Sequence, residues 1–469
     1  MVNRGGRSKG CGTCRGRRLK CDEGRPHCQR CRKAGLLCRG YALHANFVDE
    51  TARFRREDVP TQATAQVNTL VPSLVPSLVP SLVPTLVPMS LQPDEDTVLH
   101  THLVARLLPR VSGPASPHIL ASMINYESTS TAAVPLHKDA LRALAAVYFG
   151  KVHRDTRIFG AGVRAYVRSL GRLRTAVADP VAVRDVETLA SALCLGLVEN
   201  VALTETTGWL AHYDGLAHLI ERRGPAQHVQ AGFGRELFRH CRFAIVISAL
   251  LRRRPCYLAQ PAWRAVAQDT SPEGELMDLF AEVPGILHDF GGADRTQAPD
   301  ATPQSGAGLL RHVEHLLLAL SAWRQQLQLP PRASSASHTD LSMLALHHAI
   351  LLCLAPVCEA FHVSFVAGQA LKDAEAARRS VASDICRLAK ESFDRSPSST
   401  GAFLFIFPLH VAARHLPPGT DEAVWAETAM QRVIVETHGF EIGRPRTWHL
   451  ESGRVTGSAS PGSDVTTLS

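Results

Sequence analysis

The part of this sequence best suited to chemistry is a set of six cysteines within the first 38 residues. Their spacing is C-x2-C-x6-C-x6-C-x2-C-x6-C, so one C-x2-C-x6-C unit occurs twice. Six thiols this close together could form disulfides, bind an iron–sulfur cluster or bind zinc. The members of the set are Cys11, Cys14, Cys21, Cys28, Cys31 and Cys38.

The rest of the sequence favours zinc among these three uses. Disulfides need an oxidising compartment, and the first ten residues, MVNRGGRSKG, lack the apolar core of a secretory signal. The best candidate for a membrane span, Phe243 to Leu251, is too short to cross a bilayer. We therefore expect a protein of the nucleus or cytosol with no membrane partner. Iron–sulfur sites prefer tighter runs of ligands than these six-residue gaps.

A count of coordination positions predicts two zinc ions. Each tetrahedral zinc takes four thiolates, so two separate sites would need eight ligands. Six cysteines fill eight positions if two thiolates each bridge both metals, and the repeat indicates its first members, Cys11 and Cys28, as the bridges. One zinc would then be held by Cys11, Cys14, Cys21 and Cys28, and the other by Cys28, Cys31, Cys38 and Cys11.

The segment that contains the cysteines resembles a known family. From Cys11 to Cys38 it reads CGTCRGRRLKCDEGRPHCQRCRKAGLLC. This stretch resembles the fungal zinc binuclear cluster (Zn2Cys6) of transcription regulators in its six ligands, its basic C-R-x-R-R-x-K-C segment, its Cys-Asp pair and the proline two residues before the fourth cysteine. The resemblance implies two zincs with the same shared ligands.

Positive charge is concentrated in the same segment. Residues 1–40 contain twelve Lys and Arg against two Asp and Glu, whereas the whole chain has a net charge of only +8. A small module with this much positive charge is typical of proteins that bind the phosphate backbone. Together with the resemblance to transcription regulators, this charge implies double-stranded DNA as the partner.

The basic run from Arg15 to Lys20 predicts a short helix that the metals would hold at both ends, because so short a helix is unstable alone. Modules of this class place a short helix in the major groove. The resemblance puts base-reading side chains at Arg17 and Arg18, over a CGG-type half-site, where guanidinium pairs with guanine O6 and N7. Phosphate contacts are expected from Arg15, Lys20, Lys9 and Arg7.

Two further expectations concern this module. The second repeat carries basic residues that would contact phosphates or lie on the solvated face, namely Arg30, Arg32 and Lys33. Three leucines are expected to cover the small core around the metals, namely Leu19, Leu36 and Leu37.

The segment at residues 46–95 has the composition of a linker. It contains five Leu-Val-Pro units between Leu70 and Pro88. Proline at every fourth residue forbids a helix or a central strand, so this segment is predicted to be extended and disordered. No sustained heptad repeat follows the cluster, which leaves open whether the chain forms a homodimer.

Residues 96–450 have the pattern of an all-α regulatory domain, followed by a disordered tail at 451–469. The predicted fold class is therefore mainly α, with a small cluster domain at residues 1–45. The stretches Trp209–Pro225 and Arg254–Leu258 resemble the fungal-specific regulatory domain that often follows a binuclear cluster. Helices are predicted at Leu136–Phe149, Val181–Glu199, Trp209–Arg222, Arg235–Leu251, Glu275–Leu287, Leu309–Leu327, Leu341–Ala367, Ala374–Phe393 and Glu422–Thr437. The six remaining cysteines, which lie within this domain, are expected to be small buried apolar residues.

The sequence contains no P-loop, no G-x-G-x-x-G after a strand, no H-E-x-x-H and no G-x-S-x-G, so we expect no enzyme. The predicted function is a nuclear, zinc-dependent, sequence-specific regulator of transcription by RNA polymerase II. The resemblance implies control of a metabolic or secondary-metabolite gene cluster, and transcription co-regulators are left open as partners. The alternative is a zinc-dependent protein-interaction or RNA-binding regulator that does not bind specific DNA sites.

Overall fold

The computed structural model divides the chain into two units, Met1–Val87 and Pro88–Ser469. The predicted linker, except for Asp94 and Glu95, and the predicted tail lie outside the described residues. The structure describes residues 13–14, 17, 19–22, 28–36, 38, 94–107, 119–127, 134–228, 232–267, 269–295, 303–327, 337–365, 373–395, 400–445 and 448.

All regular elements among the described residues are helices, which confirms the predicted fold class. The first unit contributes α2 (Gln29–Lys33). The second contributes α3 (Glu95–Arg106), α4 (Ile119–Asn125), α5 (Leu136–Val152), α6 (Thr156–Ala178), η2 (Ala182–Arg184), α7 (Val186–Ala202), α8 (Gly208–Arg223), η3 (Pro225–His228), α9 (Phe233–Leu251), η4 (Tyr257–Ala259), α10 (Pro261–Ala267), α11 (Pro272–Phe280), α12 (Val283–Arg295), α13 (Pro303–Gln326), α14 (His338–Ala360), α15 (Ala374–Arg395), η6 (Thr400–Phe405), α16 (Ile406–Ala412), α17 (Asp421–Ala429), η7 (Met430–Thr437) and η8 (Glu441–Gly443).

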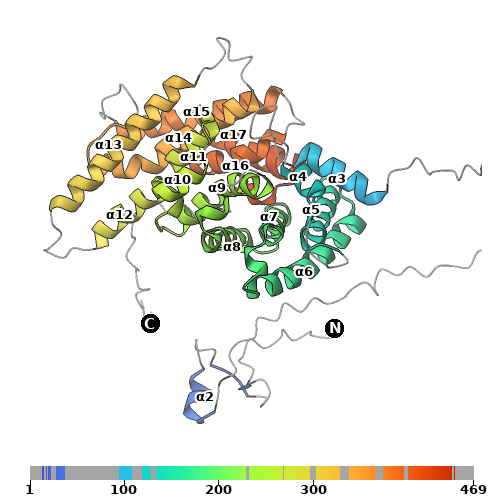
Figure 1. Ribbon diagram of the computed structural model, residues 1–469. Coiled ribbons are helices and arrows are strands. Elements are labelled where there is room, and N and C mark those ends of the chain that lie inside the picture. The colour runs from blue at the N-terminus through green and yellow to red at the C-terminus, as the bar shows by residue number, and fades with distance from the viewer. Residues whose placement is uncertain are drawn as a thin grey trace, which may run out of the picture. The chain divides into compact units, whose positions relative to one another are not determined.

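The second unit is built around two almost fully buried helices, α7 and α14. Helix α7 packs against α5, α6, α8 and α9, whereas α14 packs against α11, α12, α13, α15 and α16 (Figure 1). The two sets meet where α9 contacts α11 and α12. Apolar side chains of both central helices belong to one continuous core. Because these two helices carry few charged residues, they are suited to burial on every face.

Polar side chains mark the starts of several helices. Asp94 accepts a hydrogen bond of 2.6 Å from the amide of Thr97 at the start of α3. Ser337 and Asp340 form a reciprocal capping box at the start of α14. These side chains satisfy amide groups that have no partner within the helix. They fix the residue at which each helix begins.

Helices α5 and α6 form the tightest pair in the second unit, and glycine allows their close approach. A Cβ at Gly162 would lie 2.6 Å from the backbone nitrogen of Val147. No side chain fits at that separation, so the two backbones can touch only because this residue is glycine.

Two predictions for this region were incomplete. The helix expected at Glu275–Leu287 is two helices, because Pro284 stands at the second position of α12. Proline lacks the amide that would continue the hydrogen bonds of α11 and is well tolerated in the first turn of a helix, which favours a new start at this point. Helix α6 was not predicted, although Asp155 caps it and its buried residues Ile158, Gly162 and Ala165 have helical spacing.

Helix α14 is the one described helix long and apolar enough to cross a membrane by length and composition, and it is longer than the run at Phe243–Leu251 that sequence analysis picked. In this structure 78% of its most apolar window is buried within the helical unit. It therefore has the surroundings of a core helix.

The end of the described chain returns to the middle of the second unit. The indole of Trp448 stacks on that of Trp209 at the start of α8, with ring centroids 4.7 Å apart. Its Nε1 donates to the carbonyl of Ile442 at 3.1 Å. Both tryptophans are buried, so the final segment forms part of the core.

Candidate metal centre and nucleic-acid interface

Cys28 is the central cysteine of the first unit. It is fully buried, and it stands at the N-cap of α2, where its Sγ accepts a hydrogen bond of 3.3 Å from the amide of Cys31. The N-cap position directs the sulfur toward the positive end of the helix, which favours a thiolate. The helix thus places Cys28 and Cys31 on one side of a small buried centre.

The sulfur atoms near Cys28 lie at distances that suit a metal. The Sγ of Cys14 is 3.7 Å from that of Cys28 and 3.9 Å from that of Cys31. A disulfide would need about 2.05 Å, whereas two thiolates on a tetrahedral zinc, each about 2.3 Å from it, are roughly 3.8 Å apart. The separation of Cys14 and Cys28 therefore fits one edge of a zinc tetrahedron, and the buried thiol of Cys31 lies close to both sulfurs.

A second group of metal-binding atoms also includes Cys28. The ligand atoms of Cys21, Asp22 and Cys28 lie within 4.8 Å of one another, as do those of Cys14, Cys28 and Cys31. Cys38 is half-buried and packs against the same centre. Cys28 is thus the common member of both groups, the position that a bridging thiolate needs. Cys11 lies outside the described residues.

The internal repeat of the sequence is also a repeat of backbone hydrogen bonds. The amide of Leu19 donates to the carbonyl of Cys14 at 3.0 Å, and the equivalent amide of Leu36 donates to Cys31 at 3.0 Å. In the same way Arg17 donates to Thr13, and Ala34 to Arg30, both at 3.2 Å. The two halves therefore share one local backbone design around equivalent cysteines.

The structure describes three residues of the helix predicted at Arg15–Lys20, and none of the three is helical. Thr13 and Cys14 are helical, Arg17 is in a turn, and Leu19 and Lys20 have no helical structure. The turn therefore begins before the basic run, because it is anchored on Cys14. Arg17 and Lys20 are exposed. The other predicted DNA contacts, Arg7, Lys9, Arg15 and Arg18, lie outside the described residues.

Two residues join the repeats, and sequence analysis did not assign this role to either. The carboxylate of Asp22 accepts hydrogen bonds from the amides of Gln29 at 2.8 Å and Arg30 at 3.0 Å, at the start of α2. The Nη1 of Arg30 donates to the carbonyl of Lys20 at 2.7 Å. Arg30 is exposed, in keeping with the expectation of a solvated or phosphate-facing side chain, and its guanidinium also bonds the basic segment. The Cys21-Asp22 pair in the sequence was the feature from which the role of Asp22 could have been predicted.

The prediction that leucines cover the metal centre was wrong for the two that the structure describes. Leu19 is 41% exposed and Leu36 is 40% exposed. Leu37 lies outside the described residues. The side chains that pack in this centre are the cysteines themselves, because so small a unit has room for little else.

The cysteines of the helical unit have a different environment. Five are buried and Cys353 is half-buried, which confirms the prediction of apolar packing. Burial raises the pKa of Cys194 and Cys241 to about 12, so these thiols stay protonated. Metal chemistry is therefore expected at the N-terminal cysteines.

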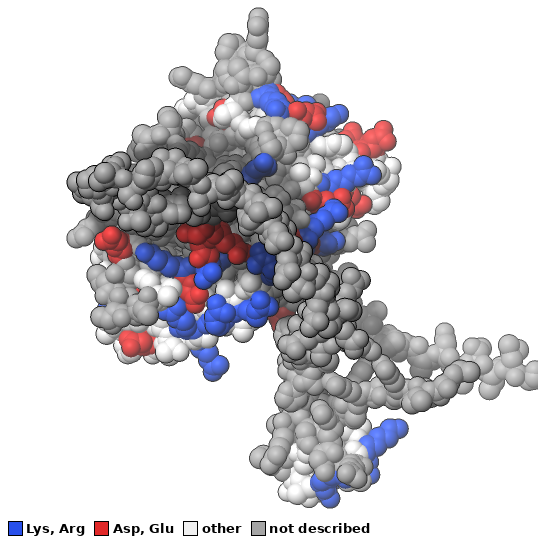
Figure 2. All heavy atoms as spheres, turned by 90° about the vertical axis from the view of Figure 1, so that its right-hand side faces the viewer, with Lys and Arg blue, Asp and Glu red and all other residues white. Residues whose placement is uncertain are grey.

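Charge is distributed differently over the two units. On the face seen in Figure 2, the described part of the first unit shows Lys and Arg side chains, whereas Lys, Arg, Asp and Glu are intermixed over the helical unit. Arg32 and Lys33 are exposed on α2, close in sequence to the metal-binding cysteines. The first unit is thus the part suited to a polyanion.

Comparison with known proteins also identifies the N-terminal cysteines as part of a zinc-binding domain. Residues 9–45 match the fungal Zn(2)-Cys(6) binuclear cluster domain family. This match confirms the resemblance drawn from the cysteine spacing, and with it the expectation of two zinc ions. No solved structure matches the chain.

Three curated proteins are similar to parts of the chain. An uncharacterized protein of Emericella nidulans is 32% identical over 130 residues, 28% of each chain. Arginine metabolism regulation protein II of Saccharomyces cerevisiae is 62% identical over 41 residues, 8% of this chain and 5% of its own. The aspercryptin biosynthesis cluster-specific transcription regulator of Emericella nidulans is 65% identical over 37 residues, 8% and 6%. The chain thus matches less than a third of each relative.

Proposed function

Because this chain carries the binuclear cluster of the fungal Zn2Cys6 transcription regulators, we propose that it is a nuclear, sequence-specific DNA-binding regulator of transcription by RNA polymerase II. Its sites would contain CGG, and its targets would be a metabolic or secondary-metabolite gene cluster. The names of two relatives support this class of target, since one regulates arginine metabolism and the other a biosynthesis cluster.

The observation that carries the proposal is the position of Cys28 in two groups of metal-binding atoms within a basic unit. We assign it as one bridging thiolate, and Cys11 as its equivalent in the first repeat. The remaining ligands would be Cys14 and Cys21 on one zinc, and Cys31 and Cys38 on the other. When bound, the zincs would hold the two halves together, because the unit has almost no apolar core of its own.

DNA recognition would follow from what the zincs position. The turn that starts at Thr13 presents Arg17 to solvent three residues after the proposed ligand Cys14. Arg17 and Arg18 would pair with guanine in the major groove, and Arg15, Lys20, Lys9 and Arg7 would contact phosphates. The bond from Arg30 to Lys20 would fix the register of this segment on the duplex.

The remaining parts of the chain would serve this activity. Residues 46–95 would act as a linker and residues 96–450 as the regulatory domain, without enzymatic activity of its own. The chain could act as a monomer or a homodimer and could recruit co-regulators. The alternative, a zinc-dependent RNA-binding or protein-interaction regulator, would use the same basic unit.

Binding of the full-length, zinc-loaded chain to short duplexes tests the proposal. A duplex with one CGG element should bind at least tenfold more tightly than a scrambled duplex of the same composition at physiological salt. A structured RNA of equal charge serves as a competitor. Equal affinity for both duplexes would refute specific DNA recognition, and preferential binding of the RNA would support the alternative.

A further inference from the structure

A cavity of about 190 Å³ lies between the two central helices of the second unit. Its walls come from α7, α8, α9, α11, α14 and η6, which are far apart in the sequence. Most of the lining is apolar, and one side carries charged groups. Apolar residues in its walls include Leu193, Leu197, Leu216, Phe243, Leu346 and Phe403.

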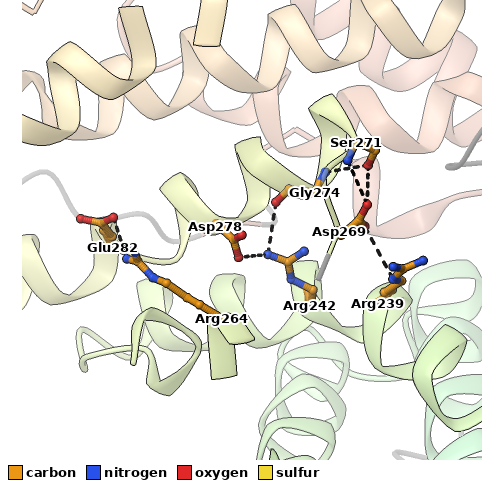
Figure 3. Close-up of polar contacts among 8 residues, drawn as sticks. All are labelled: Arg239, Arg242, Arg264, Asp269, Ser271, Gly274, Asp278 and Glu282. Atoms are coloured by element: carbon orange, nitrogen blue, oxygen red, sulfur yellow. Dashed lines mark hydrogen bonds and ion pairs between the residues drawn. The ribbon is translucent and has the colours of Figure 1, made fainter. Parts of the chain in front are cut away.

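The two arginines on the charged side already face carboxylates. Arg242, only 2% exposed, donates to the carboxylate of Asp278 and to the carbonyl of Gly274 at 3.3 Å (Figure 3). The Nε of Arg239 lies 3.8 Å from the carboxylate of Asp269 (Figure 3). An anionic ligand would have to compete with these acidic groups for each guanidinium.

Glu273 is the charged residue of the lining that has no cationic partner among the described residues. It is half-buried in the first turn of α11, and the ion pairs of the described chain do not include it. Burial raises the pKa of its carboxyl group, hydrogen bonds from its own amide and from Ser271 oppose the increase, and the negative charges of Asp269 and Asp340 add to it. A cation beside Glu273 would relieve both effects.

The size of the cavity limits its ligand to about one ring. An apolar cavity of about 150 Å³ can hold benzene, so one of this volume can hold a ring with a short side chain. We propose that the cavity binds a small amphipathic amine, with its ring among the apolar side chains of α7, α9 and α14 and its ammonium group facing Glu273. This site is separate from the metal centre and from the proposed DNA contacts.

Three probes of similar size separate the contributions of shape and charge. Calorimetric titration of the full-length, zinc-loaded chain would compare 2-phenylethylamine, the neutral 2-phenylethanol and the anionic 3-phenylpropanoate. We expect the amine to bind roughly tenfold more tightly than the alcohol, as a charge-assisted hydrogen bond would give, and the anion to bind most weakly. Equal affinities, tighter binding of the anion, or no binding of any probe at millimolar concentration would overturn the proposal.

A matched pair of variants tests the role of the carboxylate. Glu273→Gln should bring the affinities for amine and alcohol to within about twofold while the alcohol still binds. Glu275→Gln removes the same charge from an exposed position on the same helix and should preserve the preference for the amine. Loss of the preference in both variants, or in neither, would contradict the assignment. Leu346→Trp, which fills the cavity, should abolish binding of all three probes without loss of helical circular dichroism.

Discussion

The side chain of Arg30 donates a hydrogen bond of 2.7 Å to the backbone carbonyl of Lys20. The second repeat therefore holds the segment of the first repeat that we assign to DNA. The carboxylate of Asp22 strengthens this arrangement because it accepts from the amide of Arg30 at 3.0 Å. In the proposed mode of binding, DNA recognition by the first repeat would thus depend on a residue of the second that need not touch the duplex.

Arg30→Ala should weaken binding to the matched duplex more than the loss of one positive charge explains. Loss of the hydrogen bond from Arg30 to Lys20 leaves the basic segment less firmly held. The binding free energy should therefore weaken by about 1 kcal/mol, roughly fivefold in affinity. Arg32→Ala is the control, because Arg32 is exposed on the same helix and carries the same charge. Equal losses for both variants, measured by fluorescence anisotropy at one salt concentration, would show that Arg30 acts only through its charge.

The shared-thiolate assignment predicts different zinc contents for two cysteine variants. Cys28→Ala removes a ligand from both zincs, so it should prevent stable binding of the pair. Cys38→Ala removes a ligand from one zinc and should leave the other in place. Native mass spectrometry of the full chain reports the number of zincs directly. Two retained zincs in Cys28→Ala would refute its role as a bridge.

The assigned base contacts predict a change in specificity rather than in overall affinity. Arg18→Ala should lower discrimination against a duplex with one wrong base in the CGG element by about 1–3 kcal/mol. Lys9→Ala, assigned to a phosphate, should weaken binding to matched and mismatched duplexes by similar factors. Competition binding with the two duplexes measures both effects. If Arg18→Ala weakened binding to both equally, Arg18 would be a backbone contact.

The helical unit should lose stability as the pH falls below about 6.5. Burial lowers the pKa of His347 to about 3, from its ordinary 6.5. Between these values the unfolded chain binds a proton that the folded chain does not, so the free energy of unfolding falls by up to about 1.4 kcal/mol for each pH unit. His347→Phe retains an aromatic ring beside Trp323 and should reduce this dependence.

Urea unfolding at several pH values, followed by tryptophan fluorescence, measures the effect. All five tryptophans belong to the helical unit, so loss of zinc from the cluster does not contribute to the signal. A pH dependence in His347→Phe as steep as in the unchanged chain would mean that other groups control acid unfolding.

Two glycine substitutions should change stability in opposite directions. A Cβ at Gly274 would lie 2.4 Å from the carbonyl oxygen of Asp269, so Gly274→Ala should destabilise the helical unit by about 1–3 kcal/mol. Gly215 lies in the interior of α8 with open space around its Cβ position, so Gly215→Ala should stabilise it by up to about 1 kcal/mol. Thermal unfolding checks both, and destabilisation by Gly215→Ala would contradict this account.

The features that sequence analysis predicted well depend on local spacing. The clustering of cysteines such as Cys14 and Cys28 can be predicted because short spacings constrain how thiolates can surround zinc. Long apolar segments such as α7 and α14 are identifiable because a fully buried helix needs apolar side chains on every face. Neither inference needs knowledge of distant contacts.

The features that sequence analysis missed depend on contacts between distant residues. Nothing near Leu197, Phe243 or Leu346 in the sequence indicates that these side chains line one cavity. The bond from Arg30 to Lys20 likewise depends on how the two repeats face each other. The break between α11 and α12 was local, but the significance of Pro284 was overlooked beside a continuous apolar pattern.

The stacking of Trp448 on Trp209 has a consequence for biosynthesis. Trp209 leaves the ribosome well before its aromatic partner Trp448, which lies 239 residues further along the chain. A nascent or prematurely terminated chain therefore exposes this indole, a surface that chaperones and proteases recognise. The core around Trp209 can therefore close only after Trp448 has been made, so a fragment that ends before this residue differs from any chain that contains it.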